Sequence, residues 1–190
     1  MPLTALDPAP ALVVIDLQHG ILAAPTAHPV ADVVRSCATL ARAFRERGLP
    51  VVLVNVTGGA PGRTEVARTA APLDHPEGWA DLVPELDAQP GDLRVTKQTW
   101  GAFHRTGLDD LLRSHGVTQV LVTGVSTSAG VESTARAAHE HGYHVVLVTD
   151  AMTDRDAEAH RHSVARVFPR LGETATTAEV LAVIGSTPEG

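Results

Sequence analysis

Two charged residues each follow directly on a short segment with the pattern of a strand, and their positions suit acid–base chemistry. Asp16 follows ALVVI (11–15), and Lys97 follows LRVT (93–96). A carboxyl group at the end of a buried strand is partly removed from water, which raises its pKa unless a nearby cation offsets the effect. By position alone, Asp16 could as well cap a helix or close a turn, and Lys97 could be a surface lysine. These two residues alone leave both readings open.

A stretch rich in glycine and hydroxyl side chains is the third feature of this kind. Gly124–Gly130 (GVSTSAG) leads from the end of an apolar run into a helix predicted from Val131. The first N–H groups of a helix have no partner within it, so such a start can bind an anion. The stretch has neither the Lys-Ser/Thr pair of a phosphate loop nor the dinucleotide fingerprint, so we predict no cofactor.

The elements that must position these residues alternate along the chain. Continuous apolar runs rich in Val and Ile predict strands buried on both faces of a parallel sheet. The predicted strands are 11–15, 51–54, 93–96, 119–123 and 144–149. Helical spacing predicts helices from Val30 to Gly48, over 106–115 with Thr106 as N-cap, and over 131–141 before Gly142. The alternation predicts a doubly wound α/β sheet with right-handed crossovers.

The region 57–92 breaks this rhythm, because it is rich in Gly and Pro and holds at most one short helix. Long irregular segments in small domains are commonly lids or binding loops, with a passive surface loop as the alternative. Within it, Arg63 could clamp a carboxylate and Trp79 could cover a ring. A solvated Arg and a partly buried Trp are equally good readings.

Composition narrows the class of protein. The 190 residues, 44% of them hydrophobic, suit one domain over 1–190 with an ordered core from about 8 to 184. The net charge of −7 argues against a nucleic-acid partner. No apolar run approaches the ~20 residues of a membrane span, and the N-terminus lacks the layout of a secretory signal. The single cysteine is consistent with a reducing compartment, so we expect a soluble, cytoplasmic protein.

Four segments, taken together in order, resemble the isochorismatase-like, or cysteine hydrolase, superfamily. They are ALVVIDLQ (11–18), TKQTWGAFHRTGLDDLL (96–112), VLVTGVSTSAGVESTARAA (120–138) and VVLVTDAM (145–152). The resemblance implies a three-layer α/β/α, Rossmann-like domain around a mostly parallel six-stranded sheet. It also implies a small-molecule substrate and a homo-oligomer, either dimer or tetramer.

The resemblance further implies a site with an Asp after the first strand, a Lys, and usually a Cys at the start of a later helix. Asp16 and Lys97 match the first two positions, and Gly130 stands at the third. Thiol chemistry is therefore disfavoured, because Cys37 lies on the apolar stripe of the first helix and reads as structural. The metal site of some relatives needs an Asp and two His near the second strand; Asn55 and its neighbours do not match, so we predict no metal.

Isochorismatases of this superfamily also have glycine at the third position, and they hydrolyse a vinyl ether. That chemistry implies Asp16 as a general acid, with release of pyruvate, and Lys97 holding a substrate carboxylate or orienting Asp16. A nearby ammonium favours the ionised carboxylate, however, and so opposes the acid role. The expected pocket lining is Gln18, Trp100, Phe103, Ser126, Thr127 and Ala129, with core packing as the alternative for Phe103.

Two other functions remain open at this point. One is an amide or ester hydrolase that uses activated water or a hydroxyl such as that of Ser126. The other is a degenerate member that binds a small molecule without turning it over. Retention of both Asp16 and Lys97 argues against the second, because idle charges in a pocket cost desolvation energy.

Overall fold

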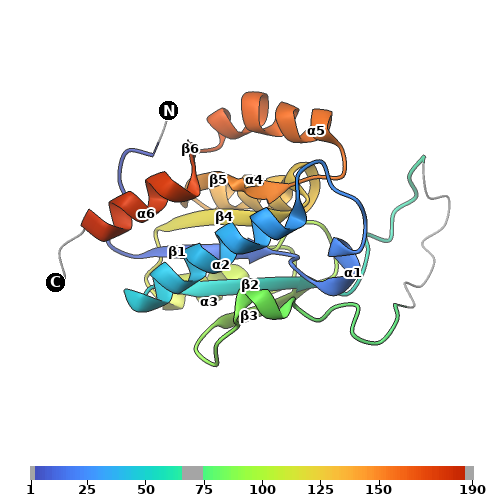
Figure 1. Ribbon diagram of the computed structural model, residues 1–190, viewed down its shortest axis with the longest axis horizontal. Helices are drawn as coiled ribbons and strands as arrows, with labels where there is room; N and C mark the ends of the chain where they lie inside the picture. The colour runs from blue at the N-terminus through green and yellow to red at the C-terminus, as the bar shows by residue number, and fades with distance from the viewer. Residues whose placement is uncertain (1–2, 66–74, 187–190) are drawn as a thin grey trace.

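A six-stranded sheet lies between two layers of helices in the computed structural model, which describes residues 3–65 and 75–186 (Figure 1). The strands are β1 (Pro10–Ile15), β2 (Val51–Val56), β3 (Leu93–Lys97), β4 (Gln119–Val125), β5 (His144–Thr153) and β6 (Glu173–Ala175). All pairings are parallel, in the order β3-β2-β1-β4-β5-β6. The five predicted strands and the six-stranded α/β/α architecture are confirmed.

The helices cover the two faces of the sheet. They are α1 (His19–Leu22), α2 (Val30–Glu46), α3 (Leu108–Ser114), α4 (Glu132–Glu140), α5 (Ala157–His162) and α6 (Thr177–Ser186). Figure 1 shows α2 and α6 in front of the sheet, with α3 and α4 behind it. Helix α6 runs slightly past the end of the predicted ordered core at about residue 184.

The strand side chains alternate between two apolar clusters. In β1, Leu12 and Val14 pack with α2 and α6, whereas Val13 and Ile15 pack with α3 and α4. Every residue of β1 and β4 is therefore buried, which explains their continuous apolar runs. The edge strand β3 alternates instead, and its last residue, Lys97, is buried.

The site residues follow from the strand order. Strands β1 and β4 are neighbours at the centre of the sheet, and the chain turns outward from them in opposite directions. Ligands of open α/β sheets bind at such a switch point, beyond the carboxyl ends of the strands. Asp16 comes directly after β1, and Ser126 comes directly after β4. The fold thus places these two segments side by side.

Helix ends agree with the predictions except at Thr106. Gly48 and Gly142 have positive φ values of 65° and 86° just beyond α2 and α4, as expected for terminating glycines. Thr106 was predicted as an N-cap, but α3 starts at Leu108 and its N-cap is Gly107. The Thr106 hydroxyl donates to the carbonyl of Ala102, and it accepts from the N–H of Leu108 at 3.3 Å. The predicted helix from Val131 is also preceded by a π-helical turn, Thr127–Val131.

The described part of region 57–92 is more ordered than a passive loop. Its helical content there is the single 3₁₀ turn Pro84–Leu86, which confirms the predicted limit of one short helix for the described residues. Leu82 bridges to Gln18, and the N–H of Val83 donates to the carbonyl of Leu17. This region is therefore anchored to the segment that follows Asp16.

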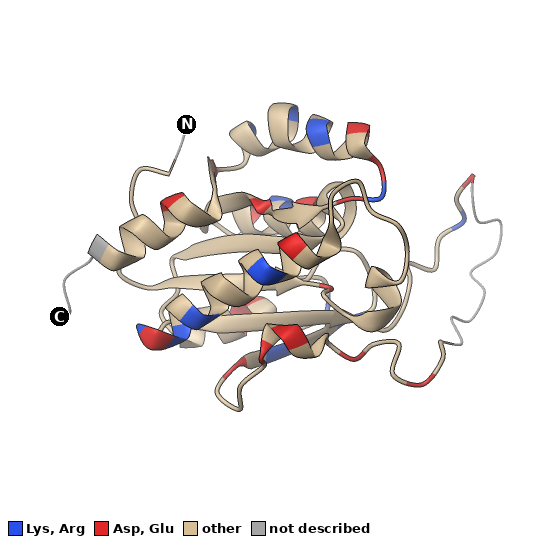
Figure 2. Ribbon diagram, in the orientation of Figure 1, with Lys and Arg blue, Asp and Glu red and all other residues tan. Residues whose placement is uncertain are grey.

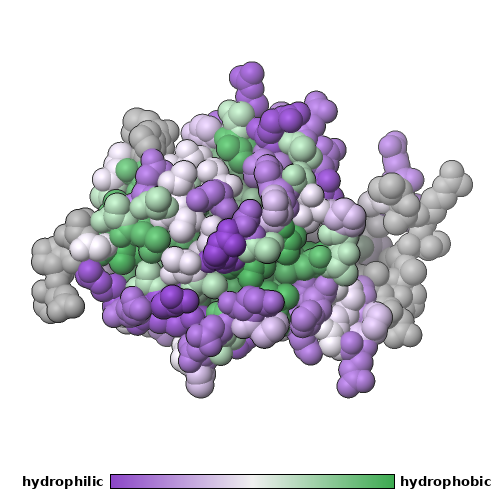
Figure 3. All heavy atoms as spheres, viewed as in Figure 1, coloured by the Kyte–Doolittle hydropathy of each residue, from purple (hydrophilic) through white to green (hydrophobic). Residues whose placement is uncertain are grey.

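The surface is mixed in charge. Figure 2 shows acidic and basic residues interspersed along the helices and loops, with no stripe of one sign on this view. Apolar side chains gather beside α2 (Figure 3), where Leu22, Val30, Val34 and Val83 line a groove. None of the predicted site residues lines this groove. No helix in the described part of the chain is long and apolar enough to span a membrane.

Candidate active site

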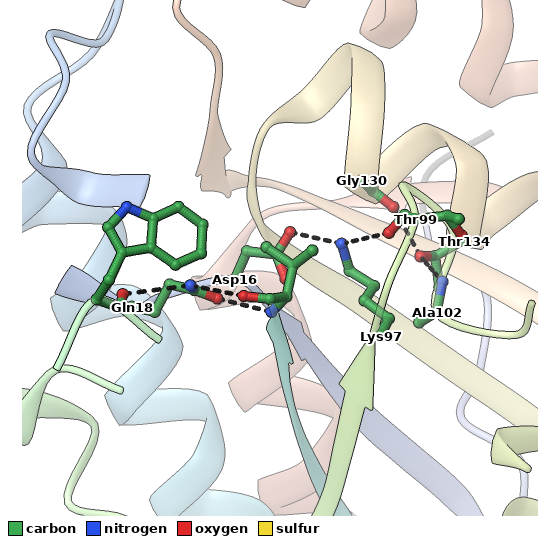
Figure 4. A network of polar contacts seen from close by, with 9 residues as sticks. Asp16, Gln18, Lys97, Thr99, Ala102, Gly130 and Thr134 are labelled. Carbon is green, nitrogen blue, oxygen red and sulfur yellow. Dashed lines mark hydrogen bonds and ion pairs between the residues drawn. The ribbon is translucent and has the colours of Figure 1, made fainter. Parts of the chain in front are cut away.

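A buried ion pair between Asp16 and Lys97 forms the centre of the site (Figure 4). Lys97 Nζ donates to Asp16 Oδ2 at 2.7 Å and to the carbonyl of Thr99 at 3.1 Å. The side chains of Lys97 and Asp16 are only 2% and 7% exposed. Lys97 is also the single lysine of the chain. This feature of the sequence singles it out from an ordinary surface lysine, which its position alone did not. The structure therefore brings together the two residues that the motifs predicted.

Burial outweighs the ion pair in setting the protonation of Asp16. Desolvation raises the pKa of Asp16 to about 6, although the charge of Lys97 and its hydrogen bond act in the opposite direction. Asp16 Oδ1 is buried and has no hydrogen-bond partner among the described residues. This carboxyl group can accordingly hold or release a proton near neutral pH.

The backbone at Asp16 is held in an unusual conformation. Its φ is +53°, in the left-handed region, which costs an L-residue about 1–2 kcal/mol. The N–H of Asp16 donates to the carbonyl of Val54 in β2, and the N–H of Gln18 donates back to the carbonyl of Asp16. Such strain at the end of a strand is typical of functional residues.

Gly130 faces the carboxyl group of Asp16. A Cβ atom at position 130 would lie 3.0 Å from Ile15 Cγ2, 3.3 Å from Asp16 Oδ2 and 3.5 Å from the carbonyl oxygen of Val125. The turn backbone thus approaches Asp16 closely, with no side chain between them. Position 130, where the resemblance leads us to expect a thiol in most family members, is adjacent to the ion pair.

Thr134 ties this turn to the loop after β3, a role that the sequence did not reveal. Its hydroxyl donates to the carbonyl of Gly130 at 2.6 Å and accepts from the N–H of Ala102 at 3.0 Å (Figure 4). A threonine in a helix whose hydroxyl bonds back to the carbonyl four residues before it is a common local pattern. Its link to Ala102, however, depends on tertiary packing.

Gln18 has a positioning role, although we expected it to line the pocket. Its Oε1 accepts from the N–H of Val56 at 2.7 Å, and its Nε2 donates to the carbonyls of Val56 and Trp79 at 3.0 and 3.3 Å. The residue is completely buried. Because the amide is bound to backbone, Gln18 fixes the end of β2 and the segment around Trp79.

Trp79 is packed on both faces. Its indole atoms lie within 2.2 Å of the place where a Gly20 Cβ would be, so the ring rests directly on the glycine. The His75 ring stacks on Trp79 with a centroid separation of 3.5 Å and an interplanar angle of 3°. Neither face is open to a substrate ring, and Arg63 is exposed to solvent.

The two aromatic residues predicted after Lys97 lie in different surroundings. Trp100 is 65% exposed. Phe103 stacks on His141 at 5.0 Å and lies near Tyr143, beyond the C-terminal end of α4. At 1.5 Å per residue, this is about 16 Å along the helix from Gly130. The structure therefore separates Phe103 from the ion pair, in agreement with the core-packing alternative.

Two further residues that the sequence reasoning missed, Asp154 and His160, hold the turn after β4. Asp154 Oδ2 accepts from the N–H and the hydroxyl of Ser128 at 2.7 and 2.8 Å. Thr127 Oγ1 lies 2.8 Å from His160 Nδ1. The predicted anion-binding start of the helix is thus already bound at Ser128 by a carboxylate of the protein. Neither residue belongs to a local pattern that points to this turn.

Cys37 is structural, as predicted. It is fully buried on α2, and its Sγ donates to the carbonyl of Ala151 at 3.3 Å. Burial raises the pKa of its thiol to about 12, so the reactive thiolate does not form near neutral pH. Within residues 3–65 and 75–186, no three His, Cys, Asp or Glu side chains cluster as a metal site.

Known proteins show similarity to this chain over most of its length. The family model for the isochorismatase domain matches residues 10–179. The isochorismatase family protein YwoC of Bacillus subtilis is 39% identical over 90% of this chain and 92% of its own length. An isochorismatase family protein of Burkholderia thailandensis superposes with a TM-score of 0.90 and 41% identity over 96% of this chain and 98% of that one. Maleamate amidohydrolase of Pseudomonas putida is 29% identical, covering 90% of this chain and 85% of that enzyme.

Proposed function

This chain belongs to the isochorismatase family of hydrolases, and we propose that it hydrolyses a small, carboxylate-bearing vinyl ether of the isochorismate type without a cysteine nucleophile. One observation carries the proposal: the carboxyl group of Asp16 is buried, has a raised pKa of about 6, and faces Gly130 rather than a thiol. A carboxyl group of this kind is suited to donate a proton near neutral pH.

In this mechanism Asp16 supplies the proton and water supplies the oxygen. The O–H bond of Asp16 breaks as the vinyl double bond takes the proton at its terminal carbon, leaving an oxocarbenium ion. Water adds to the cationic carbon and loses a proton, which restores Asp16. The resulting hemiketal collapses to the alcohol and pyruvate. General acid catalysis of this kind contributes about 10²–10⁴-fold.

Lys97 has a role that is compatible with an acidic Asp16. Its ammonium lowers the pKa of Asp16, but burial has the larger effect, and the pKa remains near 6. Two of the three N–H groups of Lys97 donate to Asp16 and to Thr99. The third is the group that we propose to bind the substrate carboxylate.

The remaining pocket residues come from the turn after β4. Ser126 and Ala129 both precede Gly130 in sequence and are partly exposed, so we propose that their small side chains contact the substrate. The Thr127 hydroxyl is bound to His160, so Thr127 contributes through its backbone. Trp100 is proposed to contact the substrate from the loop after β3.

Amide hydrolysis is the second candidate, and a specific contact favours it. Lys97 lies 2.7 Å from Asp16 Oδ2, so above pH 6 the carboxylate is ionised and can take a proton from water. The water would then attack an amide or ester carbonyl. The similarity to maleamate amidohydrolase also supports an amide as the substrate.

The two candidates differ in their products, and one experiment separates them. Purified protein is incubated with isochorismate, with pyruvate measured by a coupled dehydrogenase, and in parallel with maleamate, with ammonia measured. We expect pyruvate release above the buffer rate and its loss in Asp16→Asn. Ammonia release that depends on Asp16 would establish the second candidate instead. Binding without product, or full turnover by Asp16→Asn, would contradict the proposed mechanism.

A further inference from the structure

A buried hydrogen bond joins α5 to the turn that carries Gly130. Thr127 is completely buried, His160 is 9% exposed, and Thr127 Oγ1 lies 2.8 Å from His160 Nδ1. The two residues are 33 positions apart in the sequence. Because a buried hydroxyl without a partner is costly, each of the two side chains fixes the other.

The surroundings of His160 keep its ring neutral. Burial lowers the pKa of His160, the nearby His28 ring lowers it further, and Asp154 acts in the opposite direction. The His28 ring lies edge-on at 4.6 Å, and its Nδ1 is 3.0 Å from Thr153 Oγ1. A neutral imidazole has one donating and one accepting nitrogen, so it pairs with a hydroxyl in either tautomer.

Hydrogen bonds from three side chains, each in a different segment of the chain, hold the turn Thr127–Val131. Asp154 binds Ser128, Thr134 binds the carbonyl of Gly130, and His160 binds Thr127. A π-helical turn is rare, appears mostly as a single turn within an α-helix, and is frequent at functional sites. We infer that these three contacts hold the shape of the turn. The place of a Gly130 Cβ is 3.3 Å from Asp16 Oδ2, so a small movement of the turn changes the space beside the carboxyl group.

We propose that His160 is a positioning residue for hydrolysis at Asp16. It acts through the Thr127 hydroxyl on the turn that follows Ser126 and carries Gly130. The kinetic part of its test rests on the function proposed above; the spectroscopic part does not. His160 bonds to Thr127 on the turn, whereas Asp16 is paired with Lys97. The effect proposed for His160 is therefore on the placement of the substrate and water against Asp16. Displacements of about 1 Å can lower a rate on the order of 10²-fold.

The same two helical segments share a second contact, which supplies the control. Ser163 Oγ donates to Glu132 Oε2 at 2.6 Å, joining the segment after α5 to the first residue of α4. This contact lies beyond the turn Thr127–Val131. Ser163→Ala therefore weakens the docking of the two segments without touching Thr127, and it separates a general structural role from positioning.

The kinetic test compares His160→Leu, His160→Asn and Ser163→Ala with the unaltered protein. His160→Leu should lower kcat roughly 10- to 100-fold and change KM by less than about threefold. His160→Asn retains a polar group in place of Nδ1 and should recover most of the loss. Ser163→Ala should keep kcat within about twofold of the starting value. An unchanged kcat in His160→Leu, or an equal loss in Ser163→Ala, overturns the proposal.

A second readout needs no substrate. In ¹⁵N-labelled protein, His160→Leu and His160→Asn both remove the ring current of the imidazole, so the readout is the difference between them. The backbone amide resonances of residues 126–131 should move further in His160→Leu than in His160→Asn, and Ser163→Ala should move them least. If the unaltered protein turns over neither isochorismate nor maleamate, the proposed function fails and these resonances decide the role of His160. Equal shifts in His160→Leu and His160→Asn overturn the positioning role.

Discussion

A Cβ atom on Gly130 would lie 3.3 Å from Oδ2 of Asp16, closer than most side-chain contacts allow. The backbone of the turn after β4 therefore lies against the carboxyl group of Asp16, with room for a glycine but little room for a side chain. This approach is possible because β1 and β4 are adjacent strands, with Ile15 paired to Gly124. In the proposed mechanism, the size of residue 130 sets how closely a substrate can reach Asp16.

Gly130→Ala should lower kcat/KM at least about tenfold, because the added methyl group lies against both Ile15 and Asp16 and displaces the turn. Steady-state kinetics will measure the effect on whichever substrate, isochorismate or maleamate, the unaltered protein turns over. Gly101→Ala is the matched control, since its Cβ would meet Ser133 at an ordinary 3.5 Å. Equal kinetics for the two variants would show that position 130 does not limit access to Asp16.

The slope of the pH–rate profile should identify the role of Asp16. If Asp16 is the general acid, the protonated form is active, and kcat/KM falls as pH rises through about 6. If Asp16 is the base for amide hydrolysis, the ionised form is active and the rate rises through the same pH. Lys97→Met should move the midpoint to higher pH, because Lys97 lowers the pKa of Asp16. A profile that is flat around pH 6 would contradict both roles.

The pKa of Asp16 can also be measured without a substrate. Because Lys97 is the single lysine, ¹⁵N-lysine labelling yields one side-chain ammonium resonance. Its nitrogen is 2.7 Å from Asp16 Oδ2, so its chemical shift should titrate with a midpoint of about 6 as Asp16 ionises. Asp16→Asn should abolish this step. A midpoint near the ordinary value of 3.8 would mean that burial does not dominate.

Thiol reagents should leave the native enzyme active. Cys37 is buried and its pKa is raised to about 12, so alkylation by iodoacetamide at pH 7.5 is expected to be slow, as mass spectrometry can show. Cys37→Ala should retain turnover and lose about 1–2 kcal/mol of stability through the small cavity. Inactivation that parallels alkylation in folded protein would contradict a thiol-independent mechanism.

Gly20→Ala should displace Trp79, because the new Cβ would fall within 2.2 Å of the indole ring. We expect a loss of about 1–3 kcal/mol in unfolding free energy and a red shift of indole emission, measured in a Trp100→Phe background. Gly185→Ala on α6 is the control, since no atom lies within 4 Å of its Cβ position. An unchanged emission spectrum in Gly20→Ala would show that Trp79 does not depend on the glycine.

Much of the fold could be predicted from local patterns. Continuous apolar runs identified β1 and β4 because strands buried on both faces need apolar side chains at every position. The strand β6 was not located, since three residues are too few for a recognisable pattern. Thr106 was misplaced as an N-cap because Gly107, with a positive φ of 75°, delays the start of α3.

The ordered motifs in the sequence predicted Asp16, Lys97 and Gly130 as site residues, with glycine at the position where the resemblance implies a thiol. The tertiary structure alone decided how these groups affect one another, since the opposed effects of burial and Lys97 on Asp16 depend on distances and solvent exposure. It also decided the roles of Gln18 and His160, whose partners lie 38, 61 and 33 residues away. Contacts over such separations arise from how the elements pack, which no local spacing encodes.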